Sequence, residues 1–120
     1  MSINATPKRG DVWLVNFDPT IGSEIRKIRP AVVVSSNTIG RLPIKLVAPI
    51  TDWKDGFSRN SWHLKLEPDV MNGLAKVSAV DMLQLRGLDI QRFVRQLGQL
   101  EDEKMARIAA AIALVVEYEN

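Results

Sequence analysis

The sequence contains no cysteine, and this absence narrows the chemistry that the chain can perform. Disulfides, thiolate nucleophiles and cysteine-bound metals are excluded, and a reducing compartment, by default the cytoplasm, is the expected location. There is also only one histidine, and the carboxylates are not clustered. These residues offer no plausible zinc or two-metal site, so we expect any catalysis to need neither a metal nor another cofactor.

Segments that would direct the chain to a membrane or to a nucleotide are also missing. Residues 1–9 lack an apolar stretch of the length that a signal peptide needs, so we expect no export by this route. The apolar run at 108–116 is shorter than the roughly 20 residues that span a bilayer, and it predicts a core helix. Glycine spacings typical of phosphate-binding loops do not occur. A Ser-His-Asp triad would have to use His63, which the strand pattern places on an exposed face.

Length and hydrophobic content predict one compact domain over residues 1–120. A chain of this size with 46% hydrophobic residues can bury a core without disulfides. No linker-like shift, repeat or low-complexity tract divides it. The formal net charge is only +2, but cations crowd the first third of the chain, which favours an electropositive face. They are Lys8, Arg9, Arg26, Lys27 and Arg29.

Short apolar segments separated by turn signals predict a small antiparallel, barrel-like sheet. The expected strands are 11–17, 31–35, 44–49, 61–66, 76–80 and 82–85. Trp62, Leu64 and Leu66 alternate with polar residues, which is the pattern of a strand with one wet face, near an edge. Turn signals such as those at 55–56 and 86–87 leave no room for crossover helices between the strands.

The last segment has a helical pattern. Apolar residues recur at three- and four-residue spacing from Met105 to Val116. Acidic residues at 101–103 stand where the N-terminus of a helix favours negative charge. A helix over residues 102–118 is therefore predicted to pack on the sheet, and the fold class is mainly β with a C-terminal α-helix.

A polar, cationic loop over residues 18–28 separates two apolar segments. Its charged residues Glu24, Arg26 and Lys27 and the adjoining Arg29 lie within six consecutive positions. Arg29 stands directly before a proline, where the loop enters an apolar strand. For a charged loop in general, a solvated hairpin tip is the commoner interpretation. Arginine, however, presents a fork of donors matched to phosphate, so the alternative is an anion site.

Several ordered motifs resemble the MazF/PemK family of toxin endoribonucleases. The first half of the chain contributes RGDVW at 9–13, FDPTIGSE at 17–24, RPAVVVS at 29–35 and PIT at 49–51. The second half contributes Gly73-Leu74, Ser78, Gln84, Arg86 and Gly98-x-Leu100. Each motif alone is common, but the ordered set is specific and covers nearly the whole chain.

The resemblance implies an SH3-like barrel with a C-terminal helix, assembled as a homodimer. It also implies the toxin of a type II toxin–antitoxin system, which cleaves single-stranded RNA, including mRNA, at short sequence motifs without ribosome or metal. The expected partners are this RNA and a cognate antitoxin protein, whose disordered tail would occupy the RNA groove.

Carried over by position, Arg29 matches the family's catalytic arginine, Thr51 its catalytic threonine, and Glu24 an acidic residue that some members are thought to use as a base. Attack by the ribose 2′-hydroxyl needs a proton acceptor, a proton donor at the leaving 5′-oxygen and charge neutralisation between them. Arg29 suits neutralisation because arginine stays protonated. Glu24 is the better base, although a loop ion pair with Lys27 or Arg29 is an equally good interpretation. For Thr51 the alternative is a strand-end hydroxyl that caps a turn.

The expected RNA contacts combine cations with aromatic surfaces, the mixture that single-stranded recognition uses. Trp53 and Phe57 are equally well interpreted as lids over the core. Gln84 either reads a base edge or is a buried, hydrogen-bonded glutamine. Phe17 faces either the groove or the core. The predicted RNA-binding residues are Phe17, Thr20, Arg26, Lys27, Trp53, Lys54 and Gln84.

Two other functions remain open. A non-catalytic toxin of the same fold, binding a protein target such as DNA gyrase, would not need Arg29 and Thr51 together. A plain RNA-binding module would tolerate the loss of Glu24 and Thr51 but not of the basic loop. The loops at 37–43 and 52–60 follow no matching pattern, so the sequence does not reveal an RNA target motif.

Overall fold

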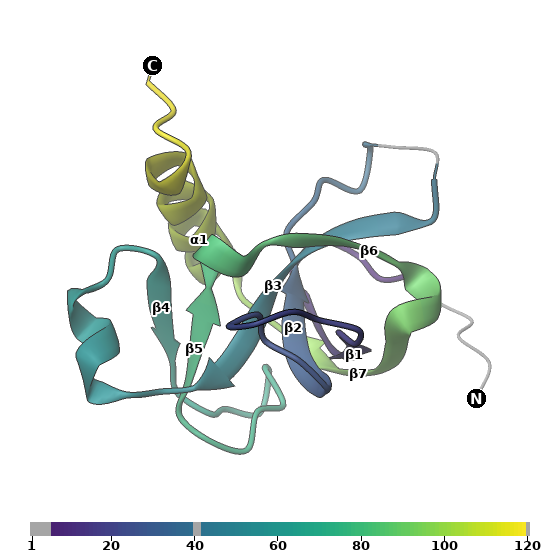
Figure 1. The fold of residues 1–120 in the computed structure, drawn as a ribbon, viewed down its shortest axis with the longest axis horizontal. Coiled ribbons are helices and arrows are strands. Elements are labelled where there is room, and N and C mark those ends of the chain that lie inside the picture. Colours follow the sequence, from purple (N-terminus) through teal and green to yellow (C-terminus); the bar gives the residue numbers. More distant parts are fainter. Residues whose placement is uncertain (1–5, 40–41, 120) are drawn as a thin grey trace.

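In the computed structural model, the described residues, 6–39 and 42–119, form seven strands followed by one α-helix (Figure 1). The strands are β1 (Asp11–Asn16), β2 (Ile28–Val33), β3 (Ile44–Asp52), β4 (His63–Leu66), β5 (Ser78–Asp81), β6 (Arg86–Asp89) and β7 (Phe93–Gln99). Three 3-10 helices, η1 (Asp55–Arg59), η2 (Met82–Gln84) and η3 (Ile90–Arg92), lie between strands, and α1 spans Asp102–Val115. Residues 1–5, part of the start in which we expect no export signal, lie outside the described residues.

The strands form one curved antiparallel sheet. Its order is β4-β5-β3-β2-β1-β7, and β6 pairs with the first half of β3. Since only η3 separates β6 from β7, one continuous stretch of chain pairs with β3 at one end and with β1 at the other. The hydrogen-bonded path is not closed, but this connection gives the sheet its barrel-like curvature. The predicted fold, mainly β and antiparallel with a C-terminal helix, is confirmed.

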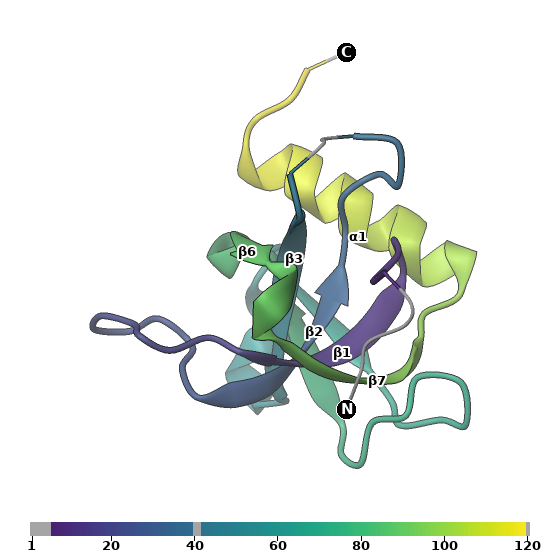
Figure 2. The ribbon, with the colours of Figure 1, turned by 90° about the vertical axis from the view of Figure 1, so that its right-hand side faces the viewer.

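The central strands are buried on both faces, which explains their nearly continuous apolar sequences. On one face, Val32 and Ala48 join a cluster that α1 covers with Met105 and Ile108. Alternate residues enter a second cluster on the other face. It comprises Trp13, Val15, Phe17, Ala31, Val33, Val47, Leu88 and Phe93. Figure 2 shows α1 across one side of the sheet and the loop between β1 and β2 projecting beyond the sheet's body.

Two glycines of the family motifs are required by close backbone packing. A Cβ atom on Gly73 would lie 2.1 Å from the carbonyl oxygen of Leu97, and one on Gly98 would lie 2.2 Å from that of Met71. Gly73 also has a φ of +68°, which side chains disfavour. These positions therefore serve the fold.

Three predictions about the strands are wrong. Residues 82–85 form η2 instead of a strand, because the Asp81 carboxylate accepts the Leu83 N–H and caps a helical turn. Residues 86–87, expected as a turn, begin β6, and β7 was not predicted. The side chain of His63 is not on an exposed face, since only 6% of it is accessible.

The C-terminal helix is confirmed but ends at Val115, three residues earlier than expected. No helix among the described residues is long and apolar enough to cross a membrane.

Candidate functional site

Arg29 and Thr51 lie within neighbouring strands. β2 begins one residue before Arg29, and β3 ends one residue after Thr51, so both strands are longer at this end than the sequence indicates. The hydrogen-bonded register between these strands ends with Ala31 opposite Pro49. Arg29 and Thr51 each lie two residues beyond this last pair, so they stand at the same end of the two paired strands.

The donor groups of these two residues are largely uncommitted. Arg29 is exposed, and its Nε donates one long hydrogen bond of 3.4 Å to the carbonyl of Arg26. Thr51 is half-buried, and its hydroxyl has no hydrogen-bond partner in the part of the chain that the structure describes. Its hydroxyl therefore does not cap a turn. Both groups are available to donate to an anionic ligand.

The β1–β2 loop, residues 17–27, is closed by hydrogen bonds between its own two ends. The Phe17 N–H donates to the Lys27 carbonyl at 2.9 Å, and the Lys27 N–H donates to Asp18 Oδ1 at 3.1 Å. Lys27 adopts a φ of 67°, a conformation that is uncommon for a lysine. The loop thus reaches β2 in a defined geometry, immediately before Arg29.

The carboxylate of Glu24 is directed to the backbone of this loop. Its Oε1 accepts the Ile21 N–H at 2.7 Å. Among the ion pairs of the described residues, none joins Glu24 to Lys27 or Arg29. The ion pair that the sequence suggested as an alternative is therefore not formed, and the exposed carboxylate retains accepting capacity.

Two arginines from the second half of the chain bind the start of the loop. Arg86 Nη1 donates to the Phe17 carbonyl at 2.8 Å, and its guanidinium lies 5.7 Å from the centroid of the Phe17 ring. Arg92 Nη1 donates to the Asn16 carbonyl at 3.2 Å and also to the Asp18 carbonyl. Arg92 was not predicted as a site residue, because no local motif distinguishes a cation at the end of η3.

Gln84 connects η2 to the middle of the same loop. Its Oε1 accepts the Ile25 N–H at 2.6 Å, and its Nε2 lies 3.3 Å from Asp81 Oδ2 and 3.5 Å from the Ser23 carbonyl oxygen. The side chain is half-buried. Of its two interpretations, the hydrogen-bonded glutamine is the state observed.

Stacked rings hold the β3–β4 loop, residues 53–62, which follows Thr51. The Phe57 ring lies over His63 at a centroid distance of 3.8 Å, and Trp53 meets Phe57 edge-on at 5.7 Å. Lys65 Nζ lies 5.2 Å from the centroid of the Trp53 ring. Burial lowers the pKa of His63, an effect opposed by the Asp81 carboxylate, which lies 3.6 Å from His63 Nε2. This histidine anchors a loop.

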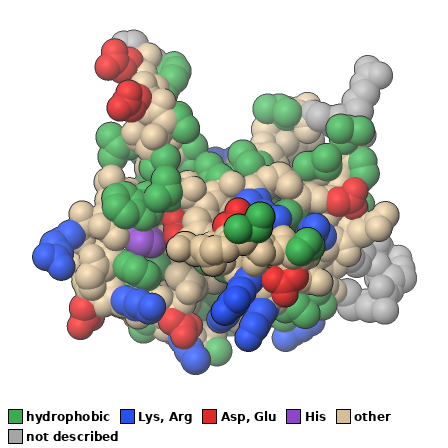
Figure 3. Space-filling view, in the orientation of Figure 1, with side chains coloured by type: hydrophobic (Ala, Val, Ile, Leu, Met, Phe, Trp, Pro, Cys, Tyr) green, Lys and Arg blue, Asp and Glu red, His purple; other side chains and the backbone are tan. Residues whose placement is uncertain are grey.

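Most of the predicted RNA contacts are accessible. The exposed or half-buried members are Thr20, Arg26, Lys27, Trp53, Lys54 and Gln84. Phe17 is fully buried in the second cluster, so of its two predicted positions the core is the one observed. Figure 3 shows Lys and Arg side chains gathered on the lower part of the face that the β1–β2 loop crosses.

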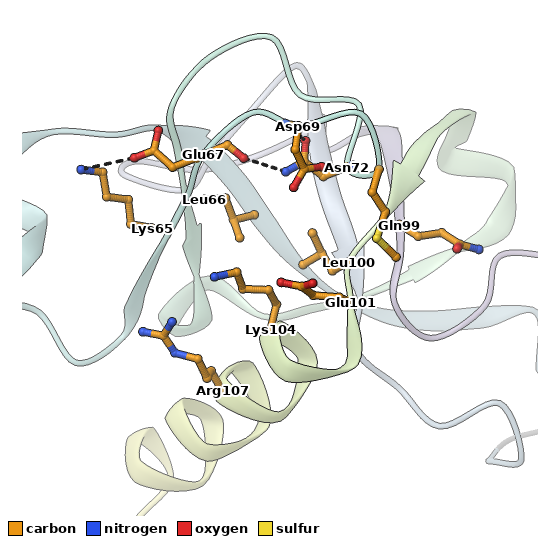
Figure 4. A pocket seen from close by; sticks show the side chains of 11 residues that line it. Lys65, Leu66, Glu67, Asp69, Asn72, Gln99, Leu100, Glu101, Lys104 and Arg107 are labelled. Carbon is orange, nitrogen blue, oxygen red and sulfur yellow. Dashed lines mark hydrogen bonds and ion pairs between the residues drawn. The ribbon is translucent and has the colours of Figure 1, made fainter.

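Two cavities differ in their suitability for a polyanion. One of about 400 Å³ lies between the β1–β2 loop and η2. It is lined by Ser23, Glu24, Leu83, Gln84, Leu85 and Arg86. Another of about 340 Å³ lies at the start of α1, where acids and bases mix and Lys65 pairs with Glu67 at 3.8 Å (Figure 4). Among the described residues, no group of three or more histidines and carboxylates is placed to hold a metal ion.

The chain is similar to known toxins in both sequence and structure. Residues 8–116 match the family of PemK-like, MazF-like toxins of type II toxin–antitoxin systems. Endoribonuclease MazF of Staphylococcus saprophyticus is 34% identical over 106 residues, 88% of this chain and 87% of that protein. The crystal structure of MazF (Form-I) from Deinococcus radiodurans has a TM-score of 0.79 at 24% identity, covering 95% of this chain and 99% of that one. The MazE–MazF structure (Form-II) from the same organism has a TM-score of 0.73 at 24% identity, covering 97% and 100%.

The two crystal structures are only 24% identical to this chain in sequence, so they establish its fold alone. The family match extends over nearly the whole chain, and the Staphylococcus relative is close enough to indicate common descent. The family predicted from the ordered motifs is confirmed. The chain belongs to the PemK-like, MazF-like family of toxins of type II toxin–antitoxin systems.

Proposed function

We propose that this toxin is a metal-independent, sequence-specific endoribonuclease that cleaves single-stranded RNA. The observation that carries the proposal is that Arg29 and Thr51 lie at the same end of two paired strands, both with available donors, beside an exposed cationic loop. The Staphylococcus relative, an endoribonuclease by name, supports the same reaction class. The substrate is a polyanion, which the cations of this face attract.

The proposed reaction is attack by a ribose 2′-hydroxyl on the adjacent phosphorus, which releases the 5′-oxygen. Its products are a 2′,3′-cyclic phosphate and a 5′-hydroxyl. Arg29 neutralises the charge that develops on the phosphoryl oxygens, and the Thr51 hydroxyl donates a second hydrogen bond to them. Glu24 is the candidate base that takes the proton of the 2′-hydroxyl, and the leaving 5′-oxygen takes up a proton from water. To act, the Glu24 carboxylate must leave the Ile21 N–H, which a rotation of the exposed side chain allows.

We also propose two protein partners, a cognate antitoxin and a second copy of this chain. The D. radiodurans relative has been crystallised as a MazE–MazF structure. In this chain, a cavity of about 670 Å³ is lined mainly by apolar residues around β3, including the exposed Ile39, Ile44 and Leu46. Such a surface favours a protein partner. A strictly monomeric mass at micromolar concentration would count against the homodimer.

The test of the reaction is incubation of antitoxin-free protein with a long single-stranded RNA in EDTA, with the ends of any fragments mapped. Discrete cuts with 5′-hydroxyl ends are expected from the wild type. The Arg29→Ala variant should be folded but inactive, whereas Arg107→Ala, on the exposed side of α1, should cut normally. Intact RNA with folded wild-type protein would favour a non-catalytic toxin with a protein target. RNA that is bound but uncut would favour a plain RNA-binding module.

A further inference from the structure

Within the described part of the chain, Gln84 is the only residue of η2 whose side chain hydrogen-bonds to the β1–β2 loop. From the geometry of this contact we infer that Gln84 is a positioning residue, which sets the conformation of the loop during RNA cleavage. The inference rests on the proposed function. It differs from a role in reading bases, because Gln84 acts through the protein's own backbone.

The orientation of the Gln84 amide is fixed by Asp81. A carboxylate can only accept hydrogen bonds, so the group that faces Asp81 Oδ2 at 3.3 Å must be the amide nitrogen. The amide oxygen is then directed to the Ile25 N–H at 2.6 Å. Asp81 is itself held, because it is buried and its Oδ1 accepts the Leu83 N–H at 3.0 Å. The loop is thus tethered to the end of β5 through two side chains.

The tether lies close in sequence to two of the proposed catalytic residues. Ile25 directly follows Glu24, and only three residues separate it from Arg29. A shift of the Ile25 backbone would therefore move the candidate base and the start of β2 together. Both polar ends of Gln84 are occupied by this arrangement, so reading a base edge would require the loop to be released.

Two substitutions test the tether in different ways. Gln84→Met keeps the length and volume of the side chain but removes both hydrogen bonds. Asp81→Asn keeps an oxygen that can accept the Leu83 N–H. Its side-chain nitrogen, however, faces the nitrogen of the Gln84 amide, and two donors cannot form a hydrogen bond with each other. The Gln84 amide should then rotate and present its nitrogen to the Ile25 N–H, which breaks the tether without changing Gln84. Gln91→Ala, at an exposed glutamine of η3, is the matched control.

Hydrogen exchange of the Ile25 amide measures the tether without RNA. We expect exchange to be roughly three- to tenfold faster in Gln84→Met and Asp81→Asn, and unchanged in Gln91→Ala. The double variant should be no worse than either single one, because both break the same link. Unchanged Ile25 exchange, or effects that simply add, would overturn the tether.

Cleavage of a random-sequence single-stranded RNA pool measures its consequence. The expected result is a lower kcat with an unchanged KM and an unchanged cleavage motif, because the loop is misplaced while the base contacts persist. A motif altered at one nucleotide position would overturn the inference and make Gln84 a base reader. If wild-type protein leaves the RNA pool intact, the proposed function is wrong, and so is the catalytic part of this inference. Hydrogen exchange of the Ile25 amide would still decide whether the tether exists.

Discussion

The β1–β2 loop and the β3–β4 loop each adjoin one candidate catalytic residue, but they are held by different interactions. The first leads into Arg29 and is bound by polar side chains from distant elements, such as Arg86. The second follows Thr51 and is held by ring stacking, with Phe57 over His63. Hydrogen bonds at the surface each contribute about 0.5–1.5 kcal/mol net and can be exchanged for bonds to a ligand. Stacked, half-buried rings have no comparable partner in water.

This contrast suggests a division of roles between the loops. The β1–β2 loop can exchange some of its hydrogen bonds for RNA contacts, because those of Glu24, Lys27 and Arg92 are exposed, whereas those of Gln84 and Arg86 are half-buried. The β3–β4 loop must lose ring contacts to move, so it provides a fixed wall beside Thr51. The two loops should therefore behave as separate units.

The largest effect is expected from Arg29→Lys, at the end of the first loop. Lysine keeps the positive charge but lacks the planar fork of donors. We expect the rate of RNA cleavage to fall by about 100-fold, as it does when an oriented donor is lost from a developing oxyanion. Single-turnover kinetics would measure this, with Arg107→Lys as the control. A wild-type rate would mean that charge alone suffices and that the loop need not orient Arg29.

A smaller loss of rate is expected from Thr51→Val, beside the second loop. The hydroxyl has no partner among the described residues, so its removal should change the free energy of unfolding by less than about 0.5 kcal/mol. The cleavage rate should fall on the order of tenfold, because one hydrogen bond to the phosphoryl group is lost. Denaturant unfolding and cleavage kinetics would be measured together. A normal rate would assign Thr51 to packing alone.

Arg86→Met should loosen the first loop and leave the second unchanged. Methionine can still cover the Phe17 ring but cannot donate to the Phe17 carbonyl. Amides of residues 17–27 should exchange roughly three- to tenfold faster, and those of 53–62 at the wild-type rate. Phe57→Leu should instead speed the exchange of amides 53–62 and leave those of 17–27 unchanged, because it removes the ring stacked on His63. If either variant loosened both loops, they would form one cooperative unit.

The central strands and the helix could be predicted because their patterns are local. Val32 and Ala31 enter opposite clusters, so the run around them is apolar throughout, and the helix repeats at its own period. β7 could not be predicted in this way. Phe93 is its only buried residue, and the strand exists because it pairs with β1, about eighty positions earlier in the chain.

The sequence allowed the residues of the candidate site to be predicted, but not most of the contacts that hold them. Arg29 and Thr51 stand in recognisable motifs, and the pairing of β2 with β3 then places them at the same end of the two strands. The bond between Gln84 and the Ile25 N–H joins residues 59 positions apart, and only the folded chain shows it. His63 was misplaced for a related reason. Its strand alternates correctly, but the ring of Phe57, in the loop that precedes the strand, covers the face that the pattern left to solvent.

The smallest expected effect is a pH dependence confined to the second loop. Burial lowers the pKa of His63 below the ordinary 6.5, and the opposing Asp81 carboxylate limits the shift. Between the lowered pKa and 6.5, the unfolded chain therefore binds more protons at this residue than the folded protein. The contribution of His63 to the free energy of unfolding should fall as the pH drops through this window and be constant above it. Denaturant unfolding at a series of pH values would measure it.

His63→Gln separates this effect from the titration of the carboxylates, because the variant lacks only the ionisable ring. The difference in free energy of unfolding between wild type and variant should shrink as the pH falls below about 6.5. A difference that grows instead would mean that attraction to Asp81 outweighs burial, so that protonation tightens the stack beneath Phe57. Amide exchange should then change in residues 53–62. A matching change in residues 17–27 would show that Asp81 transmits the charge of His63 to Gln84, which would join the two loops that the other predictions treat as separate.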